Sequence, residues 1–313
     1  MSHVYVLVEH EADELSSVTA ELITAARPLG AVSAVVVGGH ADALAGRLGE
    51  LGAAQVVDAQ VPDYDSRLIV PEVDALAALG QANPAPIVVA ATPTGNEIAG
   101  RVAARLASGA LADVVSINAD GSAEHSIFGG KYTTTATASG QCPVYSVRPG
   151  VIAAVPQPAE AQVAPMELPG AGDLDVKVTN STPAEKSARP ELTSARVVVA
   201  GGRGVEGKFA EIVEPLADAL GGAVGATRDV VDEGDYDASA QIGQTGVTVS
   251  PALYIGLGIS GAMQHISGMQ TAGTIVVINQ DGDEPFFQIA DLGVVGDLHD
   301  IAPALTAEIE SRE

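Results

Sequence analysis

The feature that most constrains this chain is a regular alternation of short β-branched runs with longer segments rich in alanine and leucine. In the first half, strands are predicted at 4–8, 33–38, 54–57 and 86–91, and helices at 15–29, 41–51, 72–79 and 96–106. Strands with this near-continuous apolar character are typical of sheets buried on both faces. The pattern therefore predicts an α/β fold in which helices cover a parallel sheet.

A second series of the same kind begins at residue 197. Strands are predicted at 197–202, 223–227, 253–258 and 274–279, and helices at 209–220, 262–269 and 301–309. Between the two series, residues 151–194 are rich in proline around one alternating run, DLDVKVT, which is typical of a linker with an edge strand.

These patterns predict two domains with parallel Rossmann-like sheets, the second of them doubly wound. We expect a nucleotide-binding-like domain at 1–150, the linker at 151–194 and a cofactor domain at 195–313. The runs at 113–120, 131–139 and 142–150 have no helices between them, so we expect them to form an additional antiparallel piece of the first domain.

Composition narrows the class of protein further. The single cysteine, Cys142, excludes a disulfide framework and any site with several thiolates. No stretch approaches the roughly 18 apolar residues of a membrane span, and no signal peptide is evident, so we expect a cytoplasmic protein that is not membrane-embedded. The formal net charge of −25 is spread evenly over the chain, which makes nucleic acid and anionic membranes poor partners.

Glycine spacing is the strongest local signal. Gly202-x-Gly204-x-x-Gly207 and Gly256-x-Gly258-x-x-Gly261 each follow a predicted strand and precede a predicted helix. Glycines in this setting allow a tight turn and close approach of the backbone to a pyrophosphate. In a chain with 35 glycines, tight strand-to-helix turns are an equally good explanation of each loop.

The residues after each loop separate the two candidates. A nicotinamide-dependent dehydrogenase needs an acidic residue for the ribose about 20 residues on. After the first loop that position falls near Thr227 and Arg228, whereas the second loop is followed by Asn279 and Asp281. The second loop is therefore the better pyrophosphate site, and a dehydrogenase that uses the first loop is a weaker alternative.

Other chemistries have little support. Phe209 occupies the position where a nucleotide-hydrolysing P-loop has Ser or Thr, and Ser260 is one residue out of register for a nucleophile elbow. The six histidines show no pair at metal-ligand spacing. Polar residues gather instead at 227–228, which ends a predicted strand, in the loop at 241–246, and at 259–265, where a predicted helix begins. Ligands of open α/β sheets bind beyond the carboxyl ends of the strands, so these three segments could line one ligand cleft.

The residues of the second domain resemble one known family, the electron-transfer flavoprotein α subunit of the bacterial type. The resemblance rests on GGRG at 201–204, VGATRDVVD at 224–232, QIGQTG at 241–246, LYIGLGISGAMQHISGM at 253–269, TIVVIN at 274–279 and FFQIADLGVVGDL at 286–298. The first domain is similar to the same family through VYVLVEH and ATPTGNEIAGRVAARLASG.

The resemblance implies a heterodimer with a β subunit and one FAD, held mainly by the second domain. It also implies that single electrons arrive from acyl-CoA and other flavin dehydrogenases and leave to a membrane quinone oxidoreductase. Such a protein is an electron carrier in fatty acid β-oxidation, with no catalytic or metal-binding residues, rather than an enzyme. A nitrogen-fixation-type or bifurcating member of the same family shares all of these motifs and stays open.

Matched position by position, the resemblance implies a set of FAD-binding residues. Arg203 reaches the cofactor, Arg228 lies against the flavin ring, the hydroxyl of Thr245 meets flavin N5 and His265 lies near the C2 carbonyl. The full set is Arg203, Thr227, Arg228, Gln241, Ile242, Gly243, Gln244, Thr245, Gly258, Ser260, Gly261, Ala262, Met263, Gln264, His265, Asn279 and Asp297.

The chemistry of these residue types agrees with the implied role. An electron added to a flavin places negative charge near N1 and the C2 carbonyl, where a fixed guanidinium and a polarising imidazole are favourable. Two departures from the family pattern are mild. Thr227 stands where serine is commoner, and residues 280–284 read QDGDE where the family usually has a Lys-Asp-Pro-Glu-Ala run.

Overall fold

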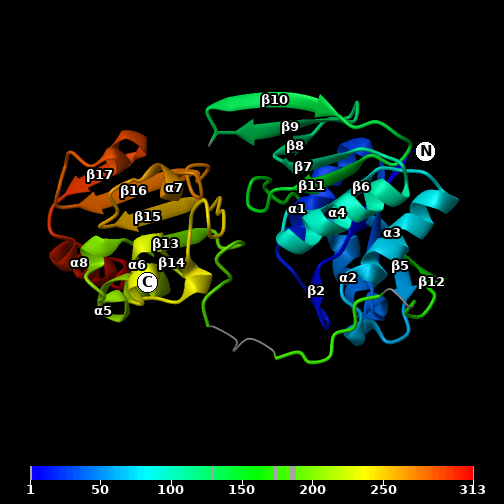
Figure 1. Ribbon diagram of the computed structural model, residues 1–313, viewed down its shortest axis with the longest axis horizontal. Coiled ribbons are helices and arrows are strands. Elements are labelled where there is room, and N and C mark those ends of the chain that lie inside the picture. Colours follow the sequence, from blue (N-terminus) through cyan, green and yellow to red (C-terminus); the bar gives the residue numbers. More distant parts are fainter. Residues whose placement is uncertain (1, 129, 173–174, 183–187, 313) are drawn as a thin grey trace. The chain divides into compact units, whose positions relative to one another are not determined.

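The structure, a computed structural model, describes residues 2–128, 130–172, 175–182 and 188–312. It divides into two compact units (Figure 1). The first comprises Met1–Ser126 and Thr133–Ala184, and the second comprises Ile127–Tyr132 and Glu185–Glu313. Each unit is built on its own parallel sheet.

The sheet of the first unit has, within the described residues, seven strands in the order β12-β5-β4-β1-β6-β11-β7, and its assigned pairs are parallel. Its strands are β1 (His3–Leu7), β4 (Ala31–Val37), β5 (Ala53–Gln60), β6 (Ile87–Ala90), β7 (Ala110–Val114), β11 (Val144–Val147) and β12 (Gln162–Glu167). A short hairpin, β2 (His10–Glu11) with β3 (Glu14–Leu15), follows β1.

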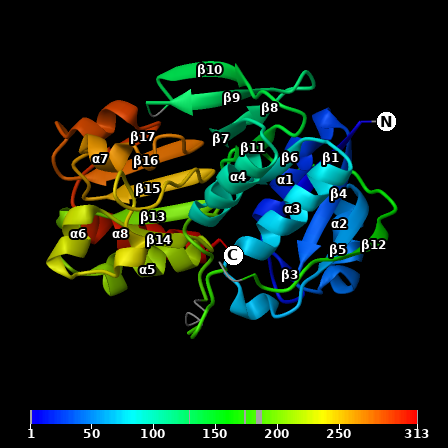
Figure 2. The same ribbon diagram turned by 45° about the vertical axis from the view of Figure 1, so that its right-hand side comes forward.

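Helices cover both faces of this sheet because successive strand residues point to opposite sides. Val4 and Val6 of β1 belong to the core beneath α1 (Val18–Ala26) and α2 (Ala41–Leu51), with the 3₁₀ turn η1 (Arg27–Leu29) after α1. Tyr5 and Leu7 belong to the opposite core beneath α3 (Val70–Ala82) and α4 (Pro93–Arg105). In Figure 2, α3 and α4 lie next to each other on one face of the sheet. The predicted α/β architecture is confirmed for this unit.

The prediction for residues 142–150 is wrong. This run forms β11, a central parallel strand between β6 and β7, rather than part of an antiparallel piece. Its four residues are buried, and Val144 pairs with Ile87 of β6. Antiparallel pairing is found instead between β8 (Ser116–Ile117) and β9 (Ser122–Ile127), in a small sheet completed by β10 (Tyr132–Thr137).

The segment expected to be a linker contributes a strand to the first sheet. β12 runs parallel to β5 at the sheet edge, so the edge strand lies at Gln162–Glu167 rather than in the run at 173–179. Of that run, residues 173–174 lie outside the described residues, and Lys177 makes an isolated bridge with Arg67. The buried Arg67 guanidinium also pairs with Asp74 and with Asp175, which fixes this segment to the first unit.

The second unit contains, among the residues described, a five-stranded parallel sheet in the order β14-β13-β15-β16-β17 (Figure 1). Its strands are β13 (Val197–Gly201), β14 (Ala223–Ala226), β15 (Leu253–Leu257), β16 (Thr274–Asn279) and β17 (Leu292–Val295). The chain places β14 on one side of β13 and β15 on the other. The connections from β13 and β15 therefore diverge, which opens a crevice at the carboxyl ends of these strands.

The two faces of the second sheet are covered differently. One face packs against α5 (Phe209–Ala219), α6 (Arg228–Glu233) and α8 (Leu298–Glu310). The other packs against the loop around Ile242 and Val249, the four-residue helix α7 (Met263–Ile266) and the 3₁₀ turn η5 (Pro285–Ile289). The predicted helix at 262–269 is thus shorter, while α6 and β17 had not been predicted.

Candidate functional site

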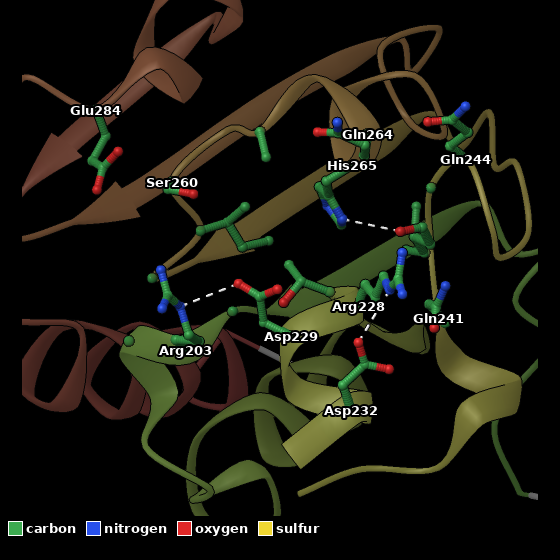
Figure 3. Close-up of a pocket in the computed structure, with 18 of the residues that line it drawn as sticks. Arg203, Arg228, Asp229, Asp232, Gln241, Gln244, Ser260, Gln264, His265 and Glu284 are labelled. Carbon is green, nitrogen blue, oxygen red and sulfur yellow. Dashed lines mark hydrogen bonds and ion pairs between the residues drawn. The ribbon is translucent and has the colours of Figure 1, made fainter. Parts of the chain in front are cut away.

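A cavity of about 610 Å³ opens at the carboxyl edge of the second sheet, where its strand order reverses. Figure 3 shows most of its lining residues as sticks. They lie at the carboxyl ends of β13, β14, β15 and β16 or in the loops that follow these strands. The cavity is lined by Gly202, Arg203, Gly204, Thr227, Arg228, Asp229, Asp232, Gln241, Ile242, Gly243, Gln244, Thr245, Gly258, Ile259, Ser260, Ala262, Gln264, His265, Asn279 and Glu284. Its volume and mixed lining suit a large organic ligand with charged groups.

The cavity brings together most of the residues proposed from the sequence, although they are spread over 77 positions of the chain from Arg203 to Asn279. Gly261, Met263 and Asp297 are not among its lining residues. Met263 is largely exposed, and Asp297 caps α8 by accepting a hydrogen bond from the backbone N–H of His299. Gly261 lies against Phe286, where an added Cβ would be only 2.4 Å from the Phe286 nitrogen.

Six lining residues were not proposed from the sequence: Gly202, Gly204, Asp229, Asp232, Ile259 and Glu284. Asp232 could have been found, because it lies four positions after Arg228 and would share a helix face with it. That signal depended on recognising α6, a six-residue helix too short to show periodicity.

The two glycine loops pack directly against each other. An added Cβ on Gly202 would lie 2.4 Å from the carbonyl oxygen of Gly258, and one on Gly204 would lie 2.8 Å from the Gly258 Cα. The backbone N–H of Gly204 donates to the same carbonyl at 3.1 Å. Glycine at 202, 204 and 258 is therefore required by loop-to-loop packing, a reason that the motif by itself did not reveal.

Two arginines bring positive charge to the cavity, and each pairs with an acidic residue of α6 (Figure 3). Arg203 Nε lies 3.2 Å from an oxygen of Asp229, and Arg228 Nε lies 3.1 Å from an oxygen of Asp232. All four side chains are more than half exposed, so these ion pairs are weak. Each guanidinium keeps further N–H groups with which it can bind an anionic ligand.

The 241–246 loop presents a hydroxyl, that of Thr245, which accepts a hydrogen bond from within the loop. The side-chain amide of Gln241 donates to Thr245 Oγ at 2.9 Å, so the Thr245 hydroxyl hydrogen is available to another acceptor. The loop itself is held to α7 by the backbone hydrogen bond from Gln244 N–H to the Gln264 carbonyl, 2.8 Å long. Gly243, at φ +135°, is needed there because a Cβ would be 2.5 Å from that carbonyl.

His265 differs from the polarising imidazole expected from the sequence. The residue is 5% exposed, with Nδ1 3.1 Å from the Ile242 carbonyl oxygen and Nε2 2.7 Å from the Tyr254 hydroxyl. Burial lowers the pKa of His265 to about 4, although the hydrogen bond with Ile242 opposes this shift. The side chain is therefore uncharged near neutral pH, and protein groups occupy both ring nitrogens.

Asn279 also has a structural role. Its buried side-chain amide donates to the carbonyl of Ile259 at 3.2 Å, and its carbonyl oxygen accepts from the backbone N–H of Asp281. The end of β16 is thereby fastened to the second glycine loop. Among the described residues, no cluster of three or more histidine, cysteine or acidic side chains is placed to hold a metal ion, and no helix is long and apolar enough to cross a membrane.

The fold and site define a class of protein in which an α/β domain binds a nucleotide-containing cofactor at a switch point. Comparison with known proteins assigns the chain to the same class. Residues 191–270 match the electron transfer flavoprotein FAD-binding domain, and residues 4–172 match the electron transfer flavoprotein domain.

Similar proteins cover the whole chain. It is 51% identical over 317 residues to the electron transfer flavoprotein subunit alpha of Mycobacterium tuberculosis, and 49% identical over 317 residues to that of Mycobacterium leprae, with 100% of each chain covered. The corresponding subunit of Paracoccus denitrificans is 38% identical over 294 residues, covering 93% of this chain and 94% of its own. The chain therefore belongs to the electron transfer flavoprotein α-subunit family.

The chain carries the FAD-binding domain of this family, and the cavity residues fit that cofactor. Arg203 and Arg228 offer charge to a diphosphate or to an electron-rich ring, while Thr245 offers a hydroxyl hydrogen. The role of this family is electron transfer, which is consistent with this chain being part of an electron carrier.

Proposed function

We propose that this chain pairs with an electron transfer flavoprotein β subunit in the cytoplasm. The heterodimer accepts single electrons from flavin dehydrogenases, acyl-CoA dehydrogenases among them, and passes them to a membrane quinone oxidoreductase. The observation that carries the proposal is the cavity, which gathers the family's FAD motifs from four strand ends of one domain.

The roles of the site residues form part of the proposal. FAD supplies the one-electron chemistry when it is bound, and the protein binds and orients it. Arg228 is the cation nearest in sequence to the β14 strand end, and we assign it to stabilising negative charge on the ring. Gln241 orients the Thr245 hydroxyl so that it donates to the cofactor rather than accepts from it.

The function of the site is to tune an electron carrier rather than to catalyse a reaction on a substrate. This assignment is supported by the hydrogen-bond donors that line the cavity, which can adjust the energy of an added electron without transferring atoms. The donor dehydrogenases and the quinone oxidoreductase rest on the family resemblance.

A visible absorption spectrum recorded during stepwise anaerobic reduction tests the proposal. The chain, co-expressed with its β subunit, should be yellow and should take up two electrons in separate one-electron steps. An acyl-CoA dehydrogenase with its substrate should then reduce it. A colourless complex that refuses added FAD but binds NADH would overturn the proposal in favour of a dehydrogenase.

A further inference from the structure

The buried contact between Tyr254 and His265 lies behind the cavity and is not explained by packing alone. Tyr254 belongs to β15, is fully buried, and its hydroxyl lies 2.7 Å from His265 Nε2. The two rings and that of Phe286 form one aromatic cluster, with centroid separations of 6.1–6.2 Å. The histidine lines the cavity, whereas the tyrosine is not among the lining residues.

Hydrogen-bond chemistry fixes where the protons lie. The carbonyl oxygen of Ile242 only accepts, so Nδ1 of His265 must carry a hydrogen. In a neutral imidazole the other nitrogen, Nε2, then has a lone pair, and the Tyr254 hydroxyl must donate to it. Each polar atom of this buried pair is satisfied by only one proton arrangement.

We infer that Tyr254 is a positioning residue that holds His265 as the neutral Nδ1–H tautomer, so that the imidazole meets the cofactor cavity without a free N–H. The consequence for FAD rests on the proposed function, whereas the proton arrangement does not. The positive charge available to the cofactor then comes from Arg203 and Arg228 rather than from the histidine.

The surroundings of His265 support this assignment. Tyr254 is the titratable group bonded to it, and burial raises the pKa of that phenol well above 10. The 241–246 loop contributes the backbone carbonyl of Ile242, and η5 contributes the apolar ring of Phe286. The charged side chains that line the cavity are Arg203, Arg228, Asp229, Asp232 and Glu284.

The substitution Tyr254→Phe removes the donor to Nε2 while it keeps the ring that fills the core. Tyr236→Phe is the matched control, because Tyr236 lies in the same unit and its hydroxyl bonds to Glu214, away from the cavity. Histidine-selective ¹⁵N NMR on the complex with the β subunit reports the state of both ring nitrogens directly.

In the unsubstituted protein we expect the His265 signals to show Nδ1–H and an accepting Nε2, unchanged from pH 8 to pH 5.5. Tyr254→Phe should shift the Nε2 signal, raise the pH at which His265 titrates, and change the reduction potential of bound FAD. Tyr236→Phe should change none of these.

A proton on Nε2 in the unsubstituted protein overturns the inference, even if Tyr254→Phe does not fold. So does a Tyr254→Phe complex whose His265 signals and FAD potential match those of the unsubstituted protein. A complex that shows the expected tautomer but refuses FAD contradicts the proposed function instead, so the two failures are distinguishable.

Discussion

At the scale of residues, the cavity is governed by the balance between two arginines and the two aspartates paired with them. The ion pairs Arg203–Asp229 and Arg228–Asp232 hold the guanidinium groups near α6. Because both pairs are exposed and weak, another anion can readily replace either aspartate as the partner of its arginine. A bound anionic cofactor therefore competes with carboxylates of the same domain for the same cations. Charge at this site is set by these four side chains together with Glu284, the other charged residue that lines the cavity.

The substitution Arg228→Ala removes the cation assigned to the flavin ring. A hydrogen bond to a charged group contributes about 1.5–3 kcal/mol, so the Kd for FAD should rise by roughly 10- to 150-fold. The reduction potential of bound FAD should fall, because an added electron loses a favourable charge. Spectroelectrochemistry measures the potential. Arg312→Ala, two residues beyond the end of α8, serves as the control, since Arg312 pairs with Glu308 and is not among the cavity's lining residues. An unchanged potential contradicts this role.

The substitution Asp229→Asn acts in the opposite direction. It removes the carboxylate that competes for Arg203, so FAD should be retained more tightly, by about two- to five-fold, in line with an exposed ion pair. The gain should shrink as salt is added, because salt screens exposed charges. Equilibrium dialysis at two ionic strengths provides the measurement. Weaker retention of FAD by Asp229→Asn at both ionic strengths would show that Asp229 positions Arg203 rather than competes with FAD for it.

At the scale of elements, the site depends on two glycine loops that fit because neither has a side chain at the contact. Gly202 and Gly204 of the first loop meet Gly258 of the second, and Asn279 anchors the second loop from β16. Close packing of two strand-to-helix turns brings their backbones to the same crevice. The motif G-x-G-x-x-G indicates such turns. Which loop packs against which is decided by the order of the strands in the sheet, because β13 and β15 are neighbours there.

The pair Gly258→Ala and Gly221→Ala separates packing from backbone strain. Both glycines have nearly the same left-handed φ, +61° and +58°, but only at Gly258 does a Cβ meet atoms within 4 Å. Gly221→Ala should lower the free energy of unfolding by about 1–2 kcal/mol. Gly258→Ala should lower it by about 3 kcal/mol or more, because steric overlap adds to the strain. Chemical denaturation of both variants gives the comparison, and equal losses would contradict loop-to-loop packing.

At the scale of the whole molecule, the buried His265 links stability to pH. Its pKa falls from 6.5 to about 4 on folding, so the unfolded chain binds a proton in this window that the folded chain does not. The part of the stability that depends on a neutral His265 is therefore fully present above pH 6.5 and is lost as the pH falls towards 4. This pKa shift corresponds to a contribution of about 3 kcal/mol to the free energy of unfolding.

The substitution His265→Gln tests this linkage. The free energy of unfolding of the FAD-free protein should fall between pH 6.5 and pH 4.5, and the slope should be shallower in His265→Gln. His125→Gln, which changes a histidine of β9 in the first unit that is not among the cavity's lining residues, should keep the original slope. Denaturant titrations at a series of pH values supply the data. Parallel slopes for all three proteins would show that His265 is not buried in the neutral form.

The sequence by itself determined the alternation of elements, and with it the parallel sheets, because strands buried on both faces and their covering helices need distinct apolar patterns. The resemblance of the second half located most of the cavity residues. Only the tertiary structure decided the parallel placement of β11, the edge strand β12 and the pairing of the glycine loops. It alone also showed that both nitrogens of His265 are bonded within the protein. Each of these depends on neighbours far apart in the chain, which local periodicity does not record.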